Sequence, residues 1–405
     1  MSPALDGLLV ADFSRVLAGP LCTMNLADLG ATVIKVERPE VGDDTRGWGP
    51  PWTDPDSAST STTSTYFESV NRTKRSVALD LSDRADRDVA VELARRADVL
   101  VENFRPGALE QFGLGYEQVK AINPGIIYVS ITGFGRGGGA DLMGYDFLVQ
   151  AVGGLMSVTG QPDGPPTKVG VALVDVLTGK DATAGVLAAL ISRGRTSHGC
   201  RVEVNLLSSL LSALVNQGQS TLATGNAPTR MGNRHPSITP YETLSCRDGL
   251  LALTCGNDRQ FSRLVAALGR PDLADDVRFS TNGERVAHRD VLFECLESLL
   301  MTDDAQTWER VLTAAGVPAG RVGSIADGFA LAQRLGLEPF SDAGSTSSPC
   351  PQVRHPAQYD THLTVPPQRP PALGEHDDEV RAWLADSSAP DLAHQPDRTP
   401  TKEMH

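Results

Sequence analysis

The sequence has few cysteines, and none of them stand close together. The six cysteines are at positions 22, 200, 246, 255, 295 and 350, without a CxxC pair. Structural zinc sites and disulfide frameworks need cysteines at short or paired spacings. We therefore expect no metal and free thiols. Free thiols are typical of a reducing compartment, so we predict a cytoplasmic protein.

Long hydrophobic runs are also missing. The most apolar stretch, residues 169–192, is interrupted by Asp175, Lys180 and Asp181. A helix that spans a bilayer needs about 20 predominantly apolar residues. Residues 1–6 lack the basic start and unbroken apolar segment of a secretory signal. The sequence therefore predicts no membrane partner.

Positive charge is scarce as well. The chain has 36 Lys and Arg against 50 Asp and Glu, which gives a formal net charge of −14. Binding to a nucleic-acid backbone depends on a basic surface. We therefore expect no nucleic-acid partner, whereas an anionic small molecule needs only a local basic pocket.

The first half of the sequence alternates short apolar segments with helical ones. Strands are predicted at 8–12, 32–37, 76–80, 98–102 and 126–131, and helices at 20–29, 83–96 and 107–122. Strands that alternate with helices form mostly parallel sheets covered by helices. We therefore predict an α/β fold with a large Rossmann-like domain, although the sequence contains no GxGxxG motif.

Further elements are predicted along the rest of the chain. Helices are expected at 145–154, 181–193 and 206–222, with a strand at 200–206. After a proline-containing connector at 226–240, a strand hairpin at 242–246 and 250–254 precedes helices at 258–268, 286–301, 304–315 and 375–385.

The chain is too long for one simple core, so two domains are expected. We assign residues 1–225 to the first part of the large Rossmann-like domain and 226–330 to a small α/β domain. Residues 331–405 are expected to return to the large domain and end in a tail. The Ser- and Thr-rich stretch 54–65 is predicted to be a mobile loop.

One carboxylate stands out because it follows an apolar segment. Asp175 comes after Val169–Val174, and burying a charge costs several kcal/mol unless the charge is partnered or used. The simpler alternative is a helix N-cap, since Asp is a favoured cap and helical sequence follows. We interpret Asp175 as a reactive group.

Several segments, taken together, resemble the family III CoA-transferases, the formyl-CoA and carnitine CoA-transferase group. The segments that carry the resemblance are Leu5–Pro20, Gly30–Pro39, Gly42–Arg46, Asn71–Ser76, Val101–Gly107, Gly144–Asp146, the Asp175 segment, Gly256–Phe261 and Leu373–His376. They extend over most of the chain, from about residue 5 to 385. The resemblance implies a CoA-binding large domain and coenzyme A, as acyl-CoA, for a substrate.

The resemblance also implies which residues bind CoA. They are Val16, Leu17, Ala18, Arg38, Arg72, Lys74, Arg75, Asn103, Phe104 and Tyr145. The residues alone allow simpler roles, which stay open here. These roles are a solvated Arg38, a tight turn at residues 16–20, a solvated loop at 72–75, and a cap and a core aromatic at 103–104.

Carboxylate chemistry then gives Asp175 a mechanism. Its attack on a donor thioester gives a mixed anhydride, which the CoA thiolate converts into an aspartyl-CoA thioester. An acceptor acid takes CoA by the reverse steps. The resemblance implies that a loop with Gly256 covers the reacting thioester and supplies backbone donors. An ordinary turn capped by Asn257 or Asp258 is the alternative.

The resemblance further implies an interlocked homodimer in which each chain threads the other. Two positions depart from the family pattern: Gln111 stands where formyl-CoA transferases have Arg, and Met143 where they have Lys. Both changes remove a cation that would touch a CoA phosphate. Lys168 or Arg136 are candidates to replace it.

Two other functions compete with CoA transfer. An α-methylacyl-CoA racemase of the same fold deprotonates the carbon next to the thioester with a His and an Asp, but this sequence has Gly144-Tyr145-Asp146 instead of Gly-His-Asp. A CoA-binding protein without catalysis would tolerate any residue at position 175. The presence of Asp175 and of the glycine loop favours the transferase.

Overall fold

The structure is a computed structural model that describes residues 2–53, 63–346 and 348–386. Residues 54–62 of the predicted loop and 387–405 of the predicted tail lie outside the described residues. The chain divides into two compact units. Unit 1 is Met1–Gly153, Gly170–Leu222 and Glu338–His405, and unit 2 is Gly154–Val169 and Ala223–Leu337. Residues 154–169, expected in the large domain, therefore group with the small one.

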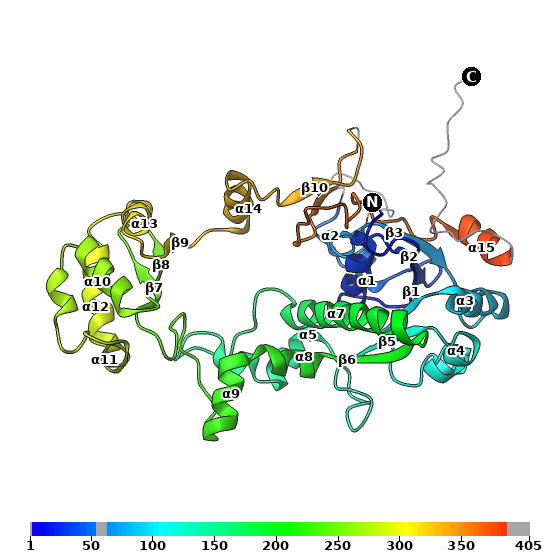
Figure 1. Ribbon diagram of the computed structural model, residues 1–405, viewed down its shortest axis with the longest axis horizontal. Helices are drawn as coiled ribbons and strands as arrows, with labels where there is room; N and C mark the ends of the chain where they lie inside the picture. Colours follow the sequence, from blue (N-terminus) through cyan, green and yellow to red (C-terminus); the bar gives the residue numbers. More distant parts are fainter. Residues whose placement is uncertain (1, 54–62, 347, 387–405) are drawn as a thin grey trace. The chain divides into compact units, whose positions relative to one another are not determined.

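Unit 1 is built around a six-stranded parallel sheet (Figure 1). Its strands are β1 (Leu9–Asp12), β2 (Thr32–Glu37), β3 (Lys74–Ala78), β4 (Val99–Glu102), β5 (Ile127–Thr132) and β6 (Cys200–Asn205). Their order across the sheet is β3-β2-β1-β4-β5-β6. Rossmann folds have this order, so the predicted Rossmann-like α/β class is confirmed.

Helices cover the sheet. α3 (Arg84–Arg96), α4 (Tyr116–Ile122) and α15 (Asp377–Ala385) share one buried core with sheet residues such as Leu100 and Tyr128. α1 (Ala18–Asp28) packs against α7 (Leu173–Thr196), which also contacts β5, β6 and α8. The other elements of unit 1 are α2 (Thr65–Glu68), α5 (Asp146–Val152), α8 (Leu206–Ala213), β10 (Phe340–Asp342), β11 (Pro351–Val353) and two 3-10 turns, η1 (Asp44–Gly47) and η2 (Glu110–Phe112). α9 (Val215–Thr224) belongs to unit 1 up to Leu222.

A glycine lets α7 approach α1 closely. A Cβ atom added at Gly179 would lie 2.7 Å from the backbone oxygen of Ala18, closer than a carbon and an oxygen can pack. Asp175 is four residues earlier and therefore on the same face of the helix. The contact between the two helices thus brings Asp175 to the turn that follows β1.

Unit 2 is a small antiparallel sheet with helices. The sheet contains β7 (Tyr241–Ser245), β8 (Leu250–Thr254) and β9 (Ala319–Arg321). The helices are α6 (Leu155–Val158), α10 (Asp258–Ala267), α11 (Asn282–Ala287), α12 (Arg289–Leu300), α13 (Ala305–Ala314) and α14 (Ile325–Arg334), with a 3-10 turn, η3 (Pro271–Ala274). The hairpin predicted at 242–254 is present, whereas β9 and α14 were not predicted.

Two helices predicted as continuous are each divided in two. The helix expected over 206–222 is α8 followed by α9, because Val215 has a φ of 35° between them. The helix expected over 286–301 starts earlier and is divided into α11 and α12 at His288. Apolar periodicity continues across both breaks, so the sequence pattern did not show them.

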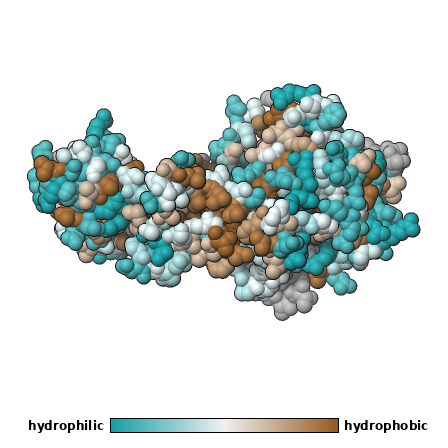
Figure 2. All heavy atoms as spheres, turned by 90° about the horizontal axis from the view of Figure 1, so that it is seen from below, coloured by the Kyte–Doolittle hydropathy of each residue, from teal (hydrophilic) through white to brown (hydrophobic). Residues whose placement is uncertain are grey.

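Several helices leave apolar side chains exposed, and Figure 2 shows hydrophobic residues reaching the surface on one face of the molecule. The exposed large apolar residues include Phe147, Val152, Val215 and Leu222. α9 has no buried residue at all. Within the described part of the chain, no helix combines the length and apolar character needed to cross a membrane.

A buried ion pair ties the first strands to the turns that follow them. Lys35 Nζ lies 2.9 Å from Asp43 Oδ2, and the two side chains are 1% and 0% exposed. Asp43 also accepts hydrogen bonds from the backbone N–H groups of Val16 and Thr45, and Lys35 donates to the backbone oxygen of Ser14. The pair therefore joins β2 to the turn after β1 and to η1.

We predict that Asp43→Ala lowers the free energy of unfolding by about 3 kcal/mol, because Lys35 then stays buried without its counter-charge. The measurement is urea unfolding followed by circular dichroism. Asp83→Ala is the control, since it removes an exposed carboxylate that caps α3 and should cost about 1 kcal/mol. A loss no larger than that of the control would contradict the prediction.

Candidate active site

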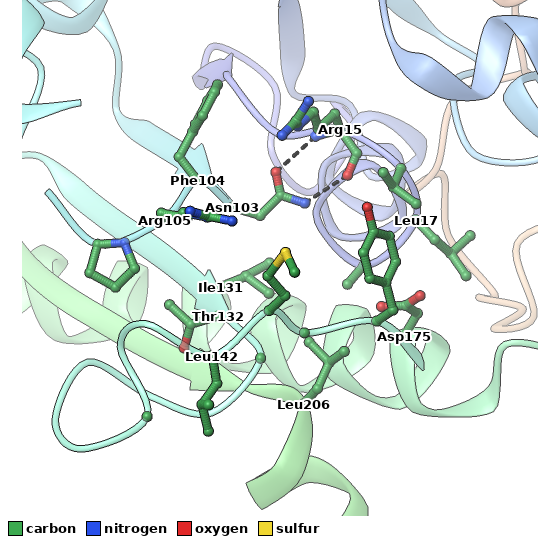
Figure 3. Close-up of a pocket in the computed structure, with 18 of the residues that line it drawn as sticks. Arg15, Leu17, Asn103, Phe104, Arg105, Ile131, Thr132, Leu142, Asp175 and Leu206 are labelled. Carbon is green, nitrogen blue, oxygen red and sulfur yellow. Dashed lines mark hydrogen bonds between the residues drawn. The ribbon is translucent and has the colours of Figure 1, made fainter. Parts of the chain in front are cut away.

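A pocket of about 500 Å³ opens in unit 1 beside the carboxyl ends of β1, β4 and β5 (Figure 3). Ligands of open α/β sheets bind at this edge. The pocket is lined mainly by residues 15–18 after β1, 103–106 after β4, 131–133 at the end of β5, 142–145 before α5, and by Asp44, Trp48, Asp175 and Leu206.

Seven of the predicted site residues lie together in the lining of this pocket. They are Val16, Leu17, Ala18, Asn103, Phe104, Tyr145 and Asp175. They come from two strand ends and from the beginnings of α5 and α7, which the parallel sheet places at one edge. The fold therefore brings together groups that are widely separated in the sequence.

Asp175 belongs to the first turn of α7 but does not cap it. The N-cap position is Ala172, which makes no side-chain cap. Instead, Asp146 Oδ1 accepts hydrogen bonds from the backbone N–H groups of Val174, at 2.7 Å, and Asp175, at 3.3 Å. The alternative interpretation of Asp175 as a helix N-cap is therefore wrong, and its side chain remains available for another role.

The carboxyl group of Asp175 is held in an unusual electrostatic setting. Burial, together with the nearby charge of Asp146, raises the pKa of Asp175 from the ordinary 3.8 to about 7. Among the described residues, no ion pair and no hydrogen bond to this carboxyl group is found, although Arg15 and Arg105 line the same pocket. Burial and the charge of Asp175 also raise the pKa of Tyr66 to about 12, which keeps that phenol neutral.

The turn after β1 is fixed by side chains from other elements. Val16 has a φ of 73°, a left-handed conformation that is rare for a β-branched residue. The Asp43 carboxylate accepts its N–H at 3.2 Å. The amide of Asn103 accepts the N–H of Arg15 at 3.0 Å and donates to the oxygen of Arg15 at 2.6 Å. The polar atoms of Asn103 therefore hold the turn that forms the pocket wall.

None of the four predicted CoA-binding cations, Arg38, Arg72, Lys74 and Arg75, is among the residues that line the pocket. Arg72 is buried and paired with Asp28, and Lys74 is buried and paired with Asp12. Arg75 pairs with Glu379. The prediction that these residues bind CoA therefore has no support from the pocket, and the alternative of a solvated loop does not fit Arg72 and Lys74, which are buried. Their charges are compensated inside the fold.

Arg38 lies at the edge of the pocket. Its side chain is 61% exposed, and its guanidinium pairs with Asp44 at 3.0 Å. Asp44 itself lines the pocket and also pairs with Arg15 at 3.0 Å. One carboxylate thus bridges two arginines at the rim, where an anionic ligand would meet them.

Two arginines in the lining were missed by the sequence analysis. Arg15 lies over the ring of Phe104, 5.7 Å from its centroid. Arg105 is exposed, and no ion pair or hydrogen bond of its guanidinium is found with any residue that the structure describes. Arg105 directly follows Asn103 and Phe104 at the end of β4, and that position was the signal that could have identified it.

The glycine loop belongs to unit 2. The N–H of Gly256 donates to Gln260 Oε1 at 2.8 Å. Asn257 is the N-cap of α10 and accepts the N–H of Gln260 at 2.9 Å. The cap assigned to Asn257 or Asp258 in the alternative is therefore confirmed for Asn257. Gly256 is exposed, and its N–H already has a partner within the loop.

The two positions that depart from the family pattern differ in location. Met143 lines the pocket, whereas the Gln111 amide donates to the backbone oxygen of Ala108. Arg136 pairs with Glu110 and Glu203, so its charge is compensated. Lys168 belongs to unit 2 and donates to the oxygen of Val169.

The pocket lacks the base that a racemase would need. No histidine is among the residues of the described chain that line it, and Tyr145 occupies the N-cap position of α5. Across the described ranges, no group of three or more His, Cys, Asp and Glu side chains is arranged to hold a metal ion. The charged groups that line the pocket are two carboxylates, Asp44 and Asp175, and two arginines, Arg15 and Arg105.

Known proteins resemble this chain over nearly its whole length. The succinate–glutarate CoA-transferase of Agrobacterium fabrum is 41% identical over 392 residues, covering 94% of this chain and 96% of that protein. The acetyl-CoA:oxalate CoA-transferase of Acetobacter aceti is 40% identical and covers 94% of this chain and 95% of that protein.

Solved structures agree with the sequence relatives. The crystal structure of a CaiB/BaiF family protein from Brucella suis has a TM-score of 0.85 and 42% identity, covering 95% of this chain and 100% of that chain. The family described as CoA-transferase family III matches residues 5–377. The resemblance noted in the sequence motifs is thereby confirmed, and this chain belongs to CoA-transferase family III.

Proposed function

We propose that this CoA-transferase moves CoA from an acyl-CoA donor to a carboxylic acid through covalent intermediates on Asp175. One observation carries the proposal: the Asp175 carboxylate lines the pocket, has no cation partner among the described residues, and has a pKa raised to about 7. Perturbed carboxylates in pockets are candidates for nucleophiles. Membership of the family supports the same reaction.

The reaction is a series of acyl substitutions, in each of which one bond to a carbonyl carbon forms and another breaks. An oxygen of Asp175 attacks the thioester carbon, and the electron pair of the C–S bond leaves with the CoA thiolate, which gives a mixed anhydride. The thiolate then attacks the aspartyl carbonyl and expels the donor acid. The acceptor carboxylate attacks the resulting aspartyl-CoA thioester, and the same two steps in reverse form the new acyl-CoA.

Short dicarboxylic acids are the proposed substrate class. Relatives at about 40% identity are named for succinate, glutarate and oxalate. The pocket offers two arginines, Arg15 and Arg105, in addition to Asp175. A planar guanidinium binds a carboxylate or a phosphate through two hydrogen bonds. The cations therefore suit the second carboxylate of a substrate as well as the phosphates of CoA.

The CoA site that we propose is smaller than the one predicted from the sequence. Val16, Leu17, Ala18 and Phe104 supply its walls, and the exposed cations near it are Arg15, Arg38 and Arg105. Arg72 and Lys74 are left out because buried carboxylates already neutralise them. Formyl-CoA transferases have an Arg at the position of Gln111, and we propose that Arg105 replaces it as a cation for a CoA phosphate.

Two parts of the proposal depend on family membership. We propose an interlocked homodimer, and the exposed apolar residues of α5 and α9 support it, since monomeric proteins rarely leave many such residues exposed. We also propose that the loop with Gly256 covers the reacting thioester in that dimer. The exposure of Gly256 leaves room for such a contact.

The covalent step predicts that Asp175→Asn lowers the rate of CoA exchange by about a thousandfold or more, because an amide is a poor nucleophile. Exchange is measured between succinyl-CoA and labelled glutarate. Wild-type enzyme treated with succinyl-CoA and hydroxylamine should carry a hydroxamate at Asp175 by peptide mass spectrometry, and the variant should not. Full activity in the variant would contradict the proposal, and Asp83→Asn, outside the pocket, serves as the control.

The raised pKa predicts a dependence of stability on pH. Between pH 3.8 and about 7 the native protein holds a proton on Asp175 that the unfolded chain has lost, so this group makes folding less favourable as the pH rises through that range. Asp175→Asn should therefore match wild type near pH 4 and exceed it by about 1–2 kcal/mol near pH 8. Thermal unfolding at both pH values measures this, and an equal difference at both would contradict it.

The unpaired arginine predicts an effect on CoA binding. Arg105→Ala should raise the KM for acyl-CoA about tenfold while kcat changes little, since a charged hydrogen bond to phosphate contributes to binding in all states. The effect should shrink as salt is added. Arg84→Ala on α3, whose side chain is 88% exposed, is the matched control. An unchanged KM would remove Arg105 from the site.

A further inference from the structure

In the described structure, Asp146 is the residue whose side chain accepts a hydrogen bond from the backbone N–H of Asp175, the proposed nucleophile. Asp146 is the first residue of α5, but its Oδ1 accepts hydrogen bonds from the N–H groups of Val174 and Asp175, which lie at the start of a different helix, α7. Its Oδ2 accepts the side-chain N–H of Gln150 at 2.7 Å, and Gln150 is fully buried. Three donors therefore hold this carboxylate in one place.

These hydrogen bonds fix the position of the first turn of α7 and hold the negative charge of Asp146 beside Asp175. Two orphan N–H groups of α7 are satisfied by Asp146, so the first turn of the helix is anchored to α5. The other titratable groups near Asp175 are Tyr66 from α2 and, among the described residues that line the same pocket, Arg15, Asp44, Arg105 and Tyr145. Arg15 is paired with Asp44, and the charge that acts on the Asp175 carboxyl group is that of Asp146.

We infer that Asp146 is a positioning residue that, on the proposed function, makes covalent adducts of Asp175 favourable relative to its free carboxylate and directs CoA onto the aspartyl carbon. The first effect follows from charge. When Asp175 attacks a thioester, its negative charge passes to the CoA sulfur, and the repulsion between two neighbouring carboxylates disappears. The anhydride and the aspartyl thioester are both neutral at this position.

The second effect follows from leaving-group chemistry. In the mixed anhydride the CoA thiolate can attack either carbonyl. Attack at the aspartyl carbon breaks the bond to the substrate carboxylate, which leaves with the electron pair, and CoA is then carried by the enzyme. Attack at the substrate carbon expels Asp175 and only reverses the first step.

The weaker acid is the poorer leaving group. Burial and Asp146 raise the pKa of Asp175 to about 7, whereas ordinary carboxylic acids have pKa values near 4. The substrate carboxylate therefore leaves more readily than Asp175, and the anhydride proceeds toward the aspartyl-CoA thioester. This preference favours the aspartyl-CoA thioester in the first half of the cycle, and in the second half it opposes the attack of CoA on the acceptor carbonyl that releases Asp175. A carboxylate that never touches the substrate thereby shifts the balance between the two ways in which the anhydride breaks down.

The test is the pH profile of kcat/KM in Asp146→Asn, which keeps a side-chain oxygen for the helix but removes the charge. The acidic limb reports ionisation of Asp175 in the free enzyme. We expect the limb to move at least about one pH unit lower than in wild type, and kcat above the limb to fall because the carboxylate becomes less basic. Asp83→Asn, the same change at an exposed helix cap on α3, should leave the limb in place.

A second variant guards against misfolding. Ser is a good helix cap without charge, so Asp146→Ser should move the limb in the same direction. A purely structural role for Asp146 would lower the thermal unfolding temperature and leave the limb unmoved in both variants, which would overturn the inference.

Hydroxylamine trapping separates this inference from the proposed function. A hydroxamate at Asp175 in wild type and in Asp146→Asn, with a shifted limb, supports both. A hydroxamate with an unshifted limb overturns only the role of Asp146. Absence of the hydroxamate from wild-type enzyme overturns the covalent route itself, and the role of Asp146 with it.

Discussion

The buried pair of Lys35 and Asp43 is the interaction on which the pocket depends. A lone carboxylate at this depth would be strongly unfavourable, but beside Lys35 it can accept the N–H groups of Val16 and Thr45 as well. Val16 has a backbone conformation that a β-branched residue rarely adopts. The pair therefore holds a strained turn in place, and that turn lines the same pocket as the proposed nucleophile.

The distribution of charge explains why one aspartate differs from the others. Burial alone would raise the pKa of Asp43, but the nearby Lys35 charge lowers it. Arg46 lowers the pKa of the buried Glu37 in the same way. Asp175 has Asp146 in place of a cation, and its pKa moves in the opposite direction. The same fold thus lowers the pKa of some carboxyl groups and raises the pKa of Asp175 to about 7, where this group can gain or lose a proton during a reaction.

Local patterns in the sequence were sufficient for the sheet and for much of the pocket. Apolar runs bounded by turns placed β1, β2 and β5 within a few residues, and the parallel sheet then gathers Val16, Asn103 and Asp175 at one edge. Contacts between distant segments were not visible in such patterns. The cap that Asp146 gives to α7 spans 29 residues, so the helix was expected to start at 181 rather than Leu173. The partners of Arg72 and Lys74 are likewise set only by tertiary packing.

The missing side chain at Gly179 has a consequence for how such a site can change over evolution. Because the Ala18 oxygen occupies the space that a Cβ atom would need, α1 and α7 can approach this closely only while residue 179 is a glycine. Asp175 lies one turn away on the same face. The position of Asp175 thus depends on a residue that has no side chain. Changes in the shape of the pocket are therefore better tolerated in the loops around it than at the contact between these two helices.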